Sequence, residues 1–374
     1  MNSKSKLWMR LAALLALGTL VVTACGGGAA QPTAAPKEMT KITLQLQWDT
    51  QSQFAGYYAA VDKGFYKDEG LEVTIKEGAV DIVPQQVLAS GQADFAVSWV
   101  PKALVSREEG AKIVDIGQVF QRSGTLEVSW KDSGITQPEH WKGKKVGTWG
   151  FGNEFELLAA IQQAGLDKDK DVTIIQQPFD MSLLLNKEVD SAEAMTYNEY
   201  AQVLEAKNPA TGKLYQPSDL TVINFNDVGT AMLQDAVWAR EDWLNDSKNQ
   251  DIAVRFLKAT FNGWIFCRDN FKECVDIVLK NGPTLGKGHM TWQLNEINKL
   301  IWPSPGGIGV MDKKLWDQTI EVATSQKVLK AAPDANAHRT DLAQKAVDAL
   351  KAAGLDVTGS SYTPQTVEIT EGGN

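Results

Sequence analysis

The sequence predicts an α/β protein of two lobes, each a mostly parallel sheet flanked by helices, with two crossovers between them. The first observation is that strand-like and helix-like segments alternate from residue 41 to about residue 215, which is typical of parallel sheets covered by helices. The second is length, because roughly 340 residues follow the N-terminal segment and exceed one ordinary hydrophobic core. The third is a pair of strand-like segments, 125–131 and 234–239, that we interpret as the crossovers.

The N-terminal segment has the pattern of a lipoprotein signal peptide. A positively charged start is followed by an apolar run over residues 11–22 and by Cys25 after a small residue. We expect residues 1–24 to be removed and residues 25–40 to form a flexible linker with a lipid on Cys25. The alternative is an ordinary signal peptide with a chance cysteine. The lipid interpretation predicts an extracytoplasmic protein that is anchored to the cell membrane.

Charge and cysteine content exclude several classes of function. The net charge of -9 and a pI near 5.1 argue against nucleic-acid binding, which needs a basic surface. The histidines His140, His289 and His338 lack zinc-site spacing, so we expect no metal. Cys267 and Cys274 cannot be bridged within one straight helix, but they could form a disulfide across a helix break with Asn270 as N-cap; the alternative is two free thiols.

The first series of elements begins with polar–apolar alternation in residues 42–47, which predicts a strand. Aromatic residues from Tyr57 to Phe65 recur at helical spacing and predict the helix that follows. Gly91 stops a later helix, and Pro101 suits the first turn of the next. The series comprises strands at 42–47, 71–75, 94–99 and 113–121 and helices at 53–64, 82–90 and 101–110.

A second series of the same kind follows a strand at 125–130, and a helical region completes the chain. The second series has strands at 145–149, 172–176, 191–197 and 219–225 and helices at 153–164, 181–187 and 198–207. After a strand at 234–239, the helical pattern covers 250–267, 271–281, 291–301, 311–327 and 340–353, with Pro283 and Pro303 as breaks. We therefore assign residues 41–130 and 234–374 to lobe 1 and residues 131–233 to lobe 2, an arrangement suited to hinge closure over a ligand.

Aromatic and amide side chains gather where the predicted strands end. Ligands of open α/β sheets bind beyond the carboxyl ends of strands, where flat aromatic faces can stack on a planar ring and amides can both donate and accept hydrogen bonds. Each aromatic residue could instead belong to the core, and Asn153 and Asn198 could instead cap helices. The candidate ligand-binding residues are Trp48, Gln53, Phe54, Tyr57, Trp99, Gln121, Trp149, Phe151, Asn153, Tyr197, Asn198 and Asp227.

The sequence contains no motif that indicates catalysis or a phosphate site. A Gly-x-Ser-x-Gly elbow, a His-Glu-x-x-His pair and a Walker A lysine are all missing from it. Arg107 and Arg122 are isolated, whereas an anionic ligand would call for paired cations or a dedicated helix N-terminus. We therefore expect a neutral, planar, hydroxylated ligand and no cofactor.

Several blocks of the sequence resemble a known family of transport proteins. These are residues 48–60, 63–71, 91–95, 142–147 and 149–154. Together they resemble the solute-binding lipoproteins of ABC transporters in the group related to thiamine-pyrimidine synthesis proteins. The resemblance covers nearly all of the mature chain. It implies the type II periplasmic-binding-protein fold, no catalysis, and a membrane permease as partner; we expect a monomer.

The residue at position 54 narrows the range of ligands that the resemblance implies. In the members that handle pyrimidines, this block resembles Trp-x-Pro-Asn-x-x-His. This chain has Thr50-Gln51 in place of the Pro-Asn pair and Phe54 in place of the histidine, and it resembles the riboflavin-binding members. We therefore expect riboflavin as the transported ligand. One alternative is the same role for a formyl- or hydroxymethyl-aminopyrimidine. Others are a synthase that makes the thiamine pyrimidine, and an anion-binding relative for sulfonates or nitrate.

Overall fold

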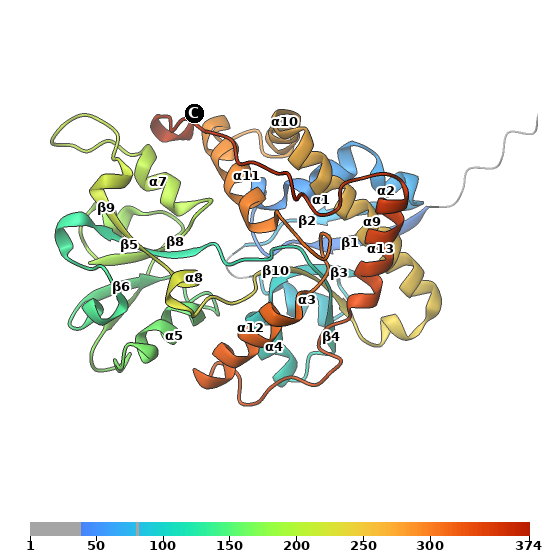
Figure 1. Ribbon diagram of the computed structural model, residues 1–374, viewed down its shortest axis with the longest axis horizontal. Helices are drawn as coiled ribbons and strands as arrows, with labels where there is room; N and C mark the ends of the chain where they lie inside the picture. The colour runs from blue at the N-terminus through green and yellow to red at the C-terminus, as the bar shows by residue number, and fades with distance from the viewer. Residues whose placement is uncertain (1–38, 80–81) are drawn as a thin grey trace, which may run out of the picture. The chain divides into compact units, whose positions relative to one another are not determined.

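The computed structural model describes residues 39–79 and 82–374, which form two five-stranded sheets flanked by helices (Figure 1). The strand order is β2-β1-β3-β10-β4 in the first sheet and β7-β6-β8-β5-β9 in the second. The predicted signal peptide, Cys25 and nearly all of the predicted linker lie outside the described residues. The predicted α/β class is confirmed, with the mostly parallel sheets that the alternation indicates.

The first sheet carries the elements that the first series predicts, with boundaries shifted by a few residues. They are β1 (Thr40–Gln45), η1 (Ser52–Phe54), α1 (Ala55–Asp62), α2 (Phe65–Asp68), β2 (Leu71–Lys76), α3 (Pro84–Ala89), β3 (Phe95–Trp99), α4 (Val100–Glu108) and β4 (Ile113–Gln118). The strands β3 and β4 are buried along their whole length because helices cover both faces of the sheet.

The second sheet contains the second series and some short helices that the sequence pattern did not indicate. Its elements are β5 (Thr125–Trp130), η2 (Lys131–Ser133), η3 (Pro138–Trp141), β6 (Lys145–Thr148), α5 (Phe155–Gln163), β7 (Thr173–Gln176), α6 (Ser182–Leu185), β8 (Ser191–Met195), α7 (Glu199–Glu205), η4 (Pro217–Asp219), β9 (Leu220–Asn224) and α8 (Phe225–Val228). The short helices were missed because three or four residues do not establish a helical period.

The chain then returns to the first sheet and ends in helices. These elements are β10 (Asp235–Arg240), η5 (Trp243–Asn245), α9 (Ser247–Asp269), α10 (Phe271–Asn281), α11 (Lys287–Ile301), α12 (Lys313–Ser325), α13 (Thr340–Ala352) and η6 (Glu371–Gly373). Helices α1 and α9 approach closely, since a Cβ added to Gly263 would lie 2.0 Å from the Gly56 carbonyl oxygen.

The crossings between the sheets are at residues 119–124 and 229–234, before the two strands that we predicted as hinges. Strand β5 pairs with β8 and β9 in the second sheet, whereas lobe 1 was expected to include it. Each sheet has one strand that runs against the others, and it is the strand that follows a crossing: β5 in one and β10 in the other. Gln234 links the crossings, because its Oε1 accepts from Gly124 N at 2.8 Å and its Nε2 donates to Thr125 Oγ1 at 2.6 Å. The assignment of two moving lobes stays a prediction.

Helices α9 and α10 are joined by a disulfide between Cys267 and Cys274, whose Cα atoms are 5.0 Å apart. The predicted helix break lies between them at Asn270. Asn270 occupies the N-cap position of α10 as predicted, but its side chain donates to Phe266 O of α9 and makes no capping hydrogen bond to α10. The alternative of two free thiols is therefore wrong for the described structure.

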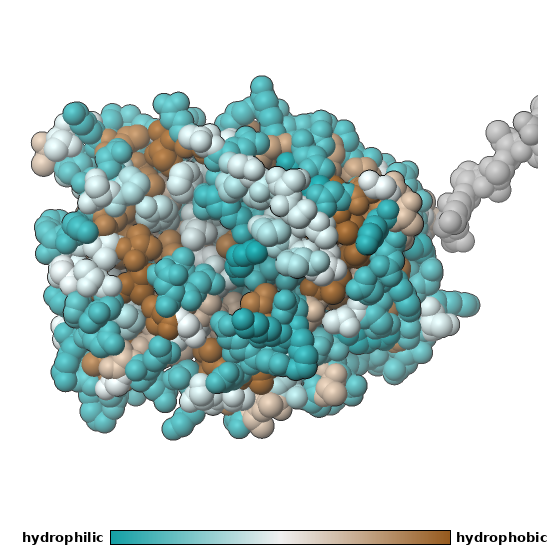
Figure 2. Space-filling model, in the orientation of Figure 1, coloured by the Kyte–Doolittle hydropathy of each residue, from teal (hydrophilic) through white to brown (hydrophobic). Residues whose placement is uncertain are grey.

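Apolar side chains fill the interior of both lobes and are scattered on the outside. On the face drawn in Figure 2, hydrophilic residues cover most of the surface and apolar residues form small separate patches. Large apolar residues with substantial exposure include Phe151 at 69% and Phe179 at 40%. No helix of residues 39–79 and 82–374 is both long and apolar enough to cross a membrane.

Candidate functional site

A cavity lies between the two sheets, at the carboxyl ends of β1 and β3 on one side and of β6 and β8 on the other. It contains about 420 Å³ of space not occupied by protein atoms. The first lobe contributes Gln47, Trp48, Gln51, Gln53, Trp99 and Lys102, and the second contributes Trp149, Asn153, Met195, Tyr197, Asn198 and Glu199. Strand ends in both lobes supply the walls, which is the position that open α/β sheets use for ligands.

Most of the predicted ligand-binding residues meet in this cavity. Trp99, Trp149 and Tyr197 are almost fully buried there, at 6%, 6% and 2% exposure. Trp48 is partly buried and contacts Phe179 of the second lobe edge to face, with 4.8 Å between ring centroids. The predicted residues that line the cavity are Trp48, Gln53, Trp99, Trp149, Asn153, Tyr197 and Asn198.

The other predicted residues lie outside the cavity lining. Phe54 and Tyr57 belong to the core of the first lobe, because they point away from the side on which Gln53 lies. Gln121 donates to Gln118 O at 2.6 Å beside the first crossing. Phe151 is exposed and has a left-handed backbone with φ of 55°, and Asp227 is exposed on α8.

Asp235 is a buried carboxylate that binds three side chains of the cavity wall, and the sequence pattern did not single it out. Its carboxylate accepts from Gln47 Nε2 at 2.6 Å, from Gln53 Nε2 at 3.0 Å and from Trp99 Nε1 at 2.8 Å. Burial raises the pKa of Asp235 to about 7, while these hydrogen bonds and the charge of Lys102 favour the carboxylate. The available sequence signal was an acid at the start of a strand whose next four residues are apolar.

Lys102 of α4 brings a positive charge to the cavity, and sequence reasoning also missed it. Its Nζ lies 3.3 Å from Asn153 Oδ1 across the cavity and 5.8 Å from the centroid of the Trp99 ring. Burial lowers the pKa of Lys102 to about 8, while the charges of Glu154, Asp235 and Glu193 raise it. The spacing in the sequence could have indicated Lys102, because it follows Trp99 by three residues and so lies near that ring on the first helical turn.

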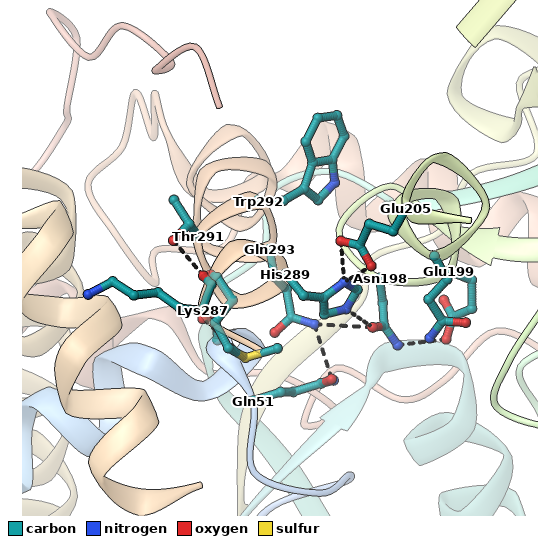
Figure 3. A network of polar contacts seen from close by, with 12 residues as sticks. Gln51, Asn198, Glu199, Glu205, Lys287, His289, Thr291, Trp292 and Gln293 are labelled. Atoms are coloured by element: carbon teal, nitrogen blue, oxygen red, sulfur yellow. Dashed lines mark hydrogen bonds and ion pairs between the residues drawn. The ribbon is translucent and has the colours of Figure 1, made fainter. Parts of the chain in front are cut away.

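A network of polar contacts joins α11 of the first lobe to α7 of the second (Figure 3). His289 Nδ1 lies 2.9 Å from Glu205 Oε1, and His289 Nε2 lies 2.7 Å from Asn198 Oδ1. Gln293 Nε2 donates to Gln51 Oε1 at 3.1 Å and to Asn198 Oδ1 at 3.4 Å. The network therefore connects an interlobe contact to side chains of the cavity wall.

The cavity lining combines flat apolar surfaces with polar groups. Indole and phenol rings supply apolar faces, amides supply paired donors and acceptors, and Lys102 supplies the positive charge. Within the part of the chain that the structure describes, no cluster of three or more His, Cys, Asp or Glu side chains could hold a metal ion.

Comparisons with known proteins place these features in a family. A family model described as NMT1/THI5 like matches residues 51–273. The riboflavin-binding protein RibY of Chloroflexus aurantiacus is 25% identical over 347 residues, which cover 87% of this chain and 95% of that protein. The formylaminopyrimidine-binding protein of Halalkalibacterium halodurans is 22% identical over 270 residues, which cover 71% of this chain and 77% of that protein.

A solved structure has the same architecture. The periplasmic aliphatic sulphonate-binding protein SsuA of Escherichia coli is 16% identical, with a TM-score of 0.56 over 88% of this chain and 94% of that chain. This likeness confirms the predicted periplasmic-binding-protein fold.

Proposed function

The chain belongs to the NMT1/THI5 like family, and we propose that it is the solute-binding component of an ABC importer that captures riboflavin between its lobes. The observation that carries this proposal is the cavity, whose aromatic and amide walls come from the strand ends of both lobes. A ligand enclosed in this way stabilises the closed form, which the permease can distinguish from the open form.

The chemistry of riboflavin matches the lining. Its fused ring system is flat and neutral, and it would lie against indole faces, where each stacked pair contributes about 0.5–1.5 kcal/mol beyond burial. The similarity to a riboflavin-binding protein over nearly the whole of both chains supports the same ligand class.

An aminopyrimidine precursor of thiamine is the second candidate. Glu199 lines the cavity, and its ionised carboxylate can only accept hydrogen bonds, which would suit an amino group of the ligand. The similarity to a formylaminopyrimidine-binding protein also favours it. Against it stands Phe54, which is fully buried in the core and cannot take the place of a ligand-binding histidine.

The remaining parts of the proposal concern location and partners. We propose that residues 1–24 direct export, that Cys25 carries a lipid anchor, and that the partner is a permease in the same membrane. The protein then acts outside the cytoplasmic membrane as a monomeric carrier without a cofactor and without catalysis. The sulfonate and nitrate alternatives would need a cation clamp, whereas Lys102 is a single charge in the cavity lining.

Titration of the purified protein with riboflavin tests the proposal. We expect tight binding, with strong quenching of riboflavin fluorescence and a much weaker response to aminopyrimidines. Asp235→Asn should weaken riboflavin binding about tenfold, because one of the three donors on that carboxylate loses its acceptor. Asp132→Asn, in exposed η2, is the matched control. Tight binding of an aminopyrimidine without flavin binding would favour the second candidate.

A further inference from the structure

Two polar atoms of the cavity wall have no hydrogen-bond partner among the residues described. They are Gln47 Oε1 of the first lobe and Trp149 Nε1 of the second, in side chains with residue exposures of 7% and 6%. Leaving a buried donor or acceptor unpaired costs about 1–3 kcal/mol, and native proteins rarely do so. Other buried atoms of the described residues, such as Trp141 Nε1 in the core, also lack a partner, but Gln47 and Trp149 line the cavity, where a ligand can supply complementary groups.

The hydrogen-bonding roles of these two atoms are fixed by their surroundings. The Nε2 of Gln47 donates to Asp235 Oδ1 at 2.6 Å, so the amide oxygen is the atom left over and it can only accept. Exchanging the amide nitrogen and oxygen would bring two acceptors together. The indole nitrogen of Trp149 can only donate. The first lobe therefore offers one acceptor, and the second lobe offers one donor.

Lys102 adds further donors at the same cavity. Its ammonium group has three protons, and the hydrogen bond that it makes is to Asn153 Oδ1 at 3.3 Å. The long distance of this bond leaves the ammonium able to turn towards a carbonyl oxygen of a ligand. The cavity thus combines one oriented acceptor with two sources of donors, and all three groups are held by residues that are buried or half-buried.

We propose that these three groups form hydrogen bonds with the imide edge of the ligand, in which an N–H lies between two carbonyl groups. Gln47 Oε1 accepts from the imide N–H, while Trp149 Nε1 and Lys102 Nζ donate to the two carbonyl oxygens. This inference rests on the proposed function, because the isoalloxazine ring of riboflavin carries such an edge. An aminopyrimidine lacks a donor flanked by two carbonyl acceptors, so the same groups reject it.

The arrangement also couples recognition to closure. Gln47 and Lys102 belong to the first lobe and Trp149 to the second, so the imide edge completes its hydrogen bonds only when both lobes contact it. A ligand that presents the wrong edge would leave Gln47 Oε1 or Trp149 Nε1 unpaired in the closed form. The edge that a ligand presents therefore affects the stability of the closed form as well as the affinity of the first contact with one lobe.

Affinities of riboflavin and 3-methylriboflavin, measured by fluorescence titration, test this inference. The methyl group replaces the imide proton, and we expect it to weaken binding to the natural protein roughly tenfold or more. In Gln47→Ala, riboflavin should bind more weakly, and the ratio between the two ligands should fall towards one, because the acceptor is gone and space for the methyl group appears. Equal affinity of the natural protein for both ligands would overturn the inference.

A pair of tryptophan variants separates a ligand contact from a structural effect. Trp149→Phe keeps an aromatic ring and removes the N–H, and we expect riboflavin affinity to fall roughly fivefold or more. The matched control is Trp141→Phe, which removes another unpartnered indole N–H in the second lobe but in a core position with 0% exposure. Equal affinities in both variants would overturn the inference while leaving riboflavin binding in place. Failure of the natural protein to bind any flavin would overturn the proposed function as well.

Discussion

At the scale of single residues, two buried carboxyl groups face each other across β5 and β8. Glu127 lies directly opposite Glu193 in the antiparallel register, and each has one oxygen without a hydrogen-bond partner among the described residues. Burial raises the pKa of both groups well above the ordinary value, and the charge of Glu127 raises that of Glu193 further. A proton held by this pair in the folded protein relieves the repulsion between the two groups.

The raised pKa values predict how stability depends on pH. The unfolded chain releases these protons near the ordinary glutamate pKa of 4.5, while the folded protein keeps them to higher pH. The free energy of unfolding contributed by the pair is therefore highest below about pH 4.5 and falls as the pH rises above it. Glu127→Gln supplies an N–H without a charge, so we expect it to raise the free energy of unfolding at pH 7.5 by at least ~1 kcal/mol.

Urea unfolding of the variant and the natural protein at pH 7.5 and pH 4.5 measures this effect. We expect the gain to be smaller at pH 4.5, where the natural pair holds its protons. Glu139→Gln, at an exposed position of η3, is the control and should change little at either pH. A loss of stability at pH 7.5 in Glu127→Gln would contradict the assignment of a proton-holding pair.

At the scale of elements, the contact between α7 and α11 holds the two lobes together. Asn198 Nδ2 donates to Glu199 Oε1 at 2.7 Å, which leaves Asn198 Oδ1 as the acceptor that faces His289. The Glu205 carboxylate faces the other ring nitrogen, so both nitrogens of His289 contact acceptors of the second lobe (Figure 3). The C-terminal segment reinforces the same junction through the ion pair of Lys207 with Glu371 at 2.6 Å.

His289→Ala should loosen this junction. Its loss removes two hydrogen bonds between the lobes, worth about 1–2 kcal/mol to the closed form, so we expect riboflavin affinity to fall roughly five- to thirtyfold. Most of the change should appear as faster dissociation in stopped-flow measurements, because closure holds the ligand in place. Lys287→Ala is the matched control, since its ion pair with Asp276 at 2.6 Å stays within the first lobe. Unchanged dissociation in His289→Ala would mean that α7 and α11 do not hold the closed form.

At the scale of the whole molecule, ligand binding should connect the two lobes more firmly. The crossings at residues 119–124 and 229–234 are bonded to each other through Gln234, and the cavity takes its walls from both sides. A ligand at one hundred times its Kd adds about 2.7 kcal/mol to the stability of the folded protein. This stabilisation should be concentrated where the ligand bridges the lobes.

Hydrogen exchange with and without riboflavin tests that expectation. We expect added protection in the loops that follow β1, β3, β6 and β8 and in both crossings. Helices α9 and α10 serve as the internal control, because the disulfide and the first core already hold them. Protection confined to one lobe would contradict closure over the ligand, even if riboflavin binds.

Local periodicity was enough to predict most of the strands and helices. The alternation in residues 42–47 and the helical spacing after Tyr57 depend only on neighbours in sequence, and β1 and α1 formed where they indicated. The same reasoning placed Trp48, Trp99 and Trp149 at strand ends, and parallel strands bring such ends to one edge of a sheet. The sequence by itself therefore determined the α/β class, the two series of elements and the aromatic character of the cavity.

The tertiary structure alone decided which side chains share the cavity. Gln53 and Phe54 are neighbours, but one turns to the cavity and the other to the core, because successive residues of a helical turn point in different directions. Asp235 meets Gln47, Gln53 and Trp99 only after the chain has built a second lobe and returned. Long-range packing and hydrogen bonding set these contacts and the exact crossings, and no local pattern in the sequence encodes them.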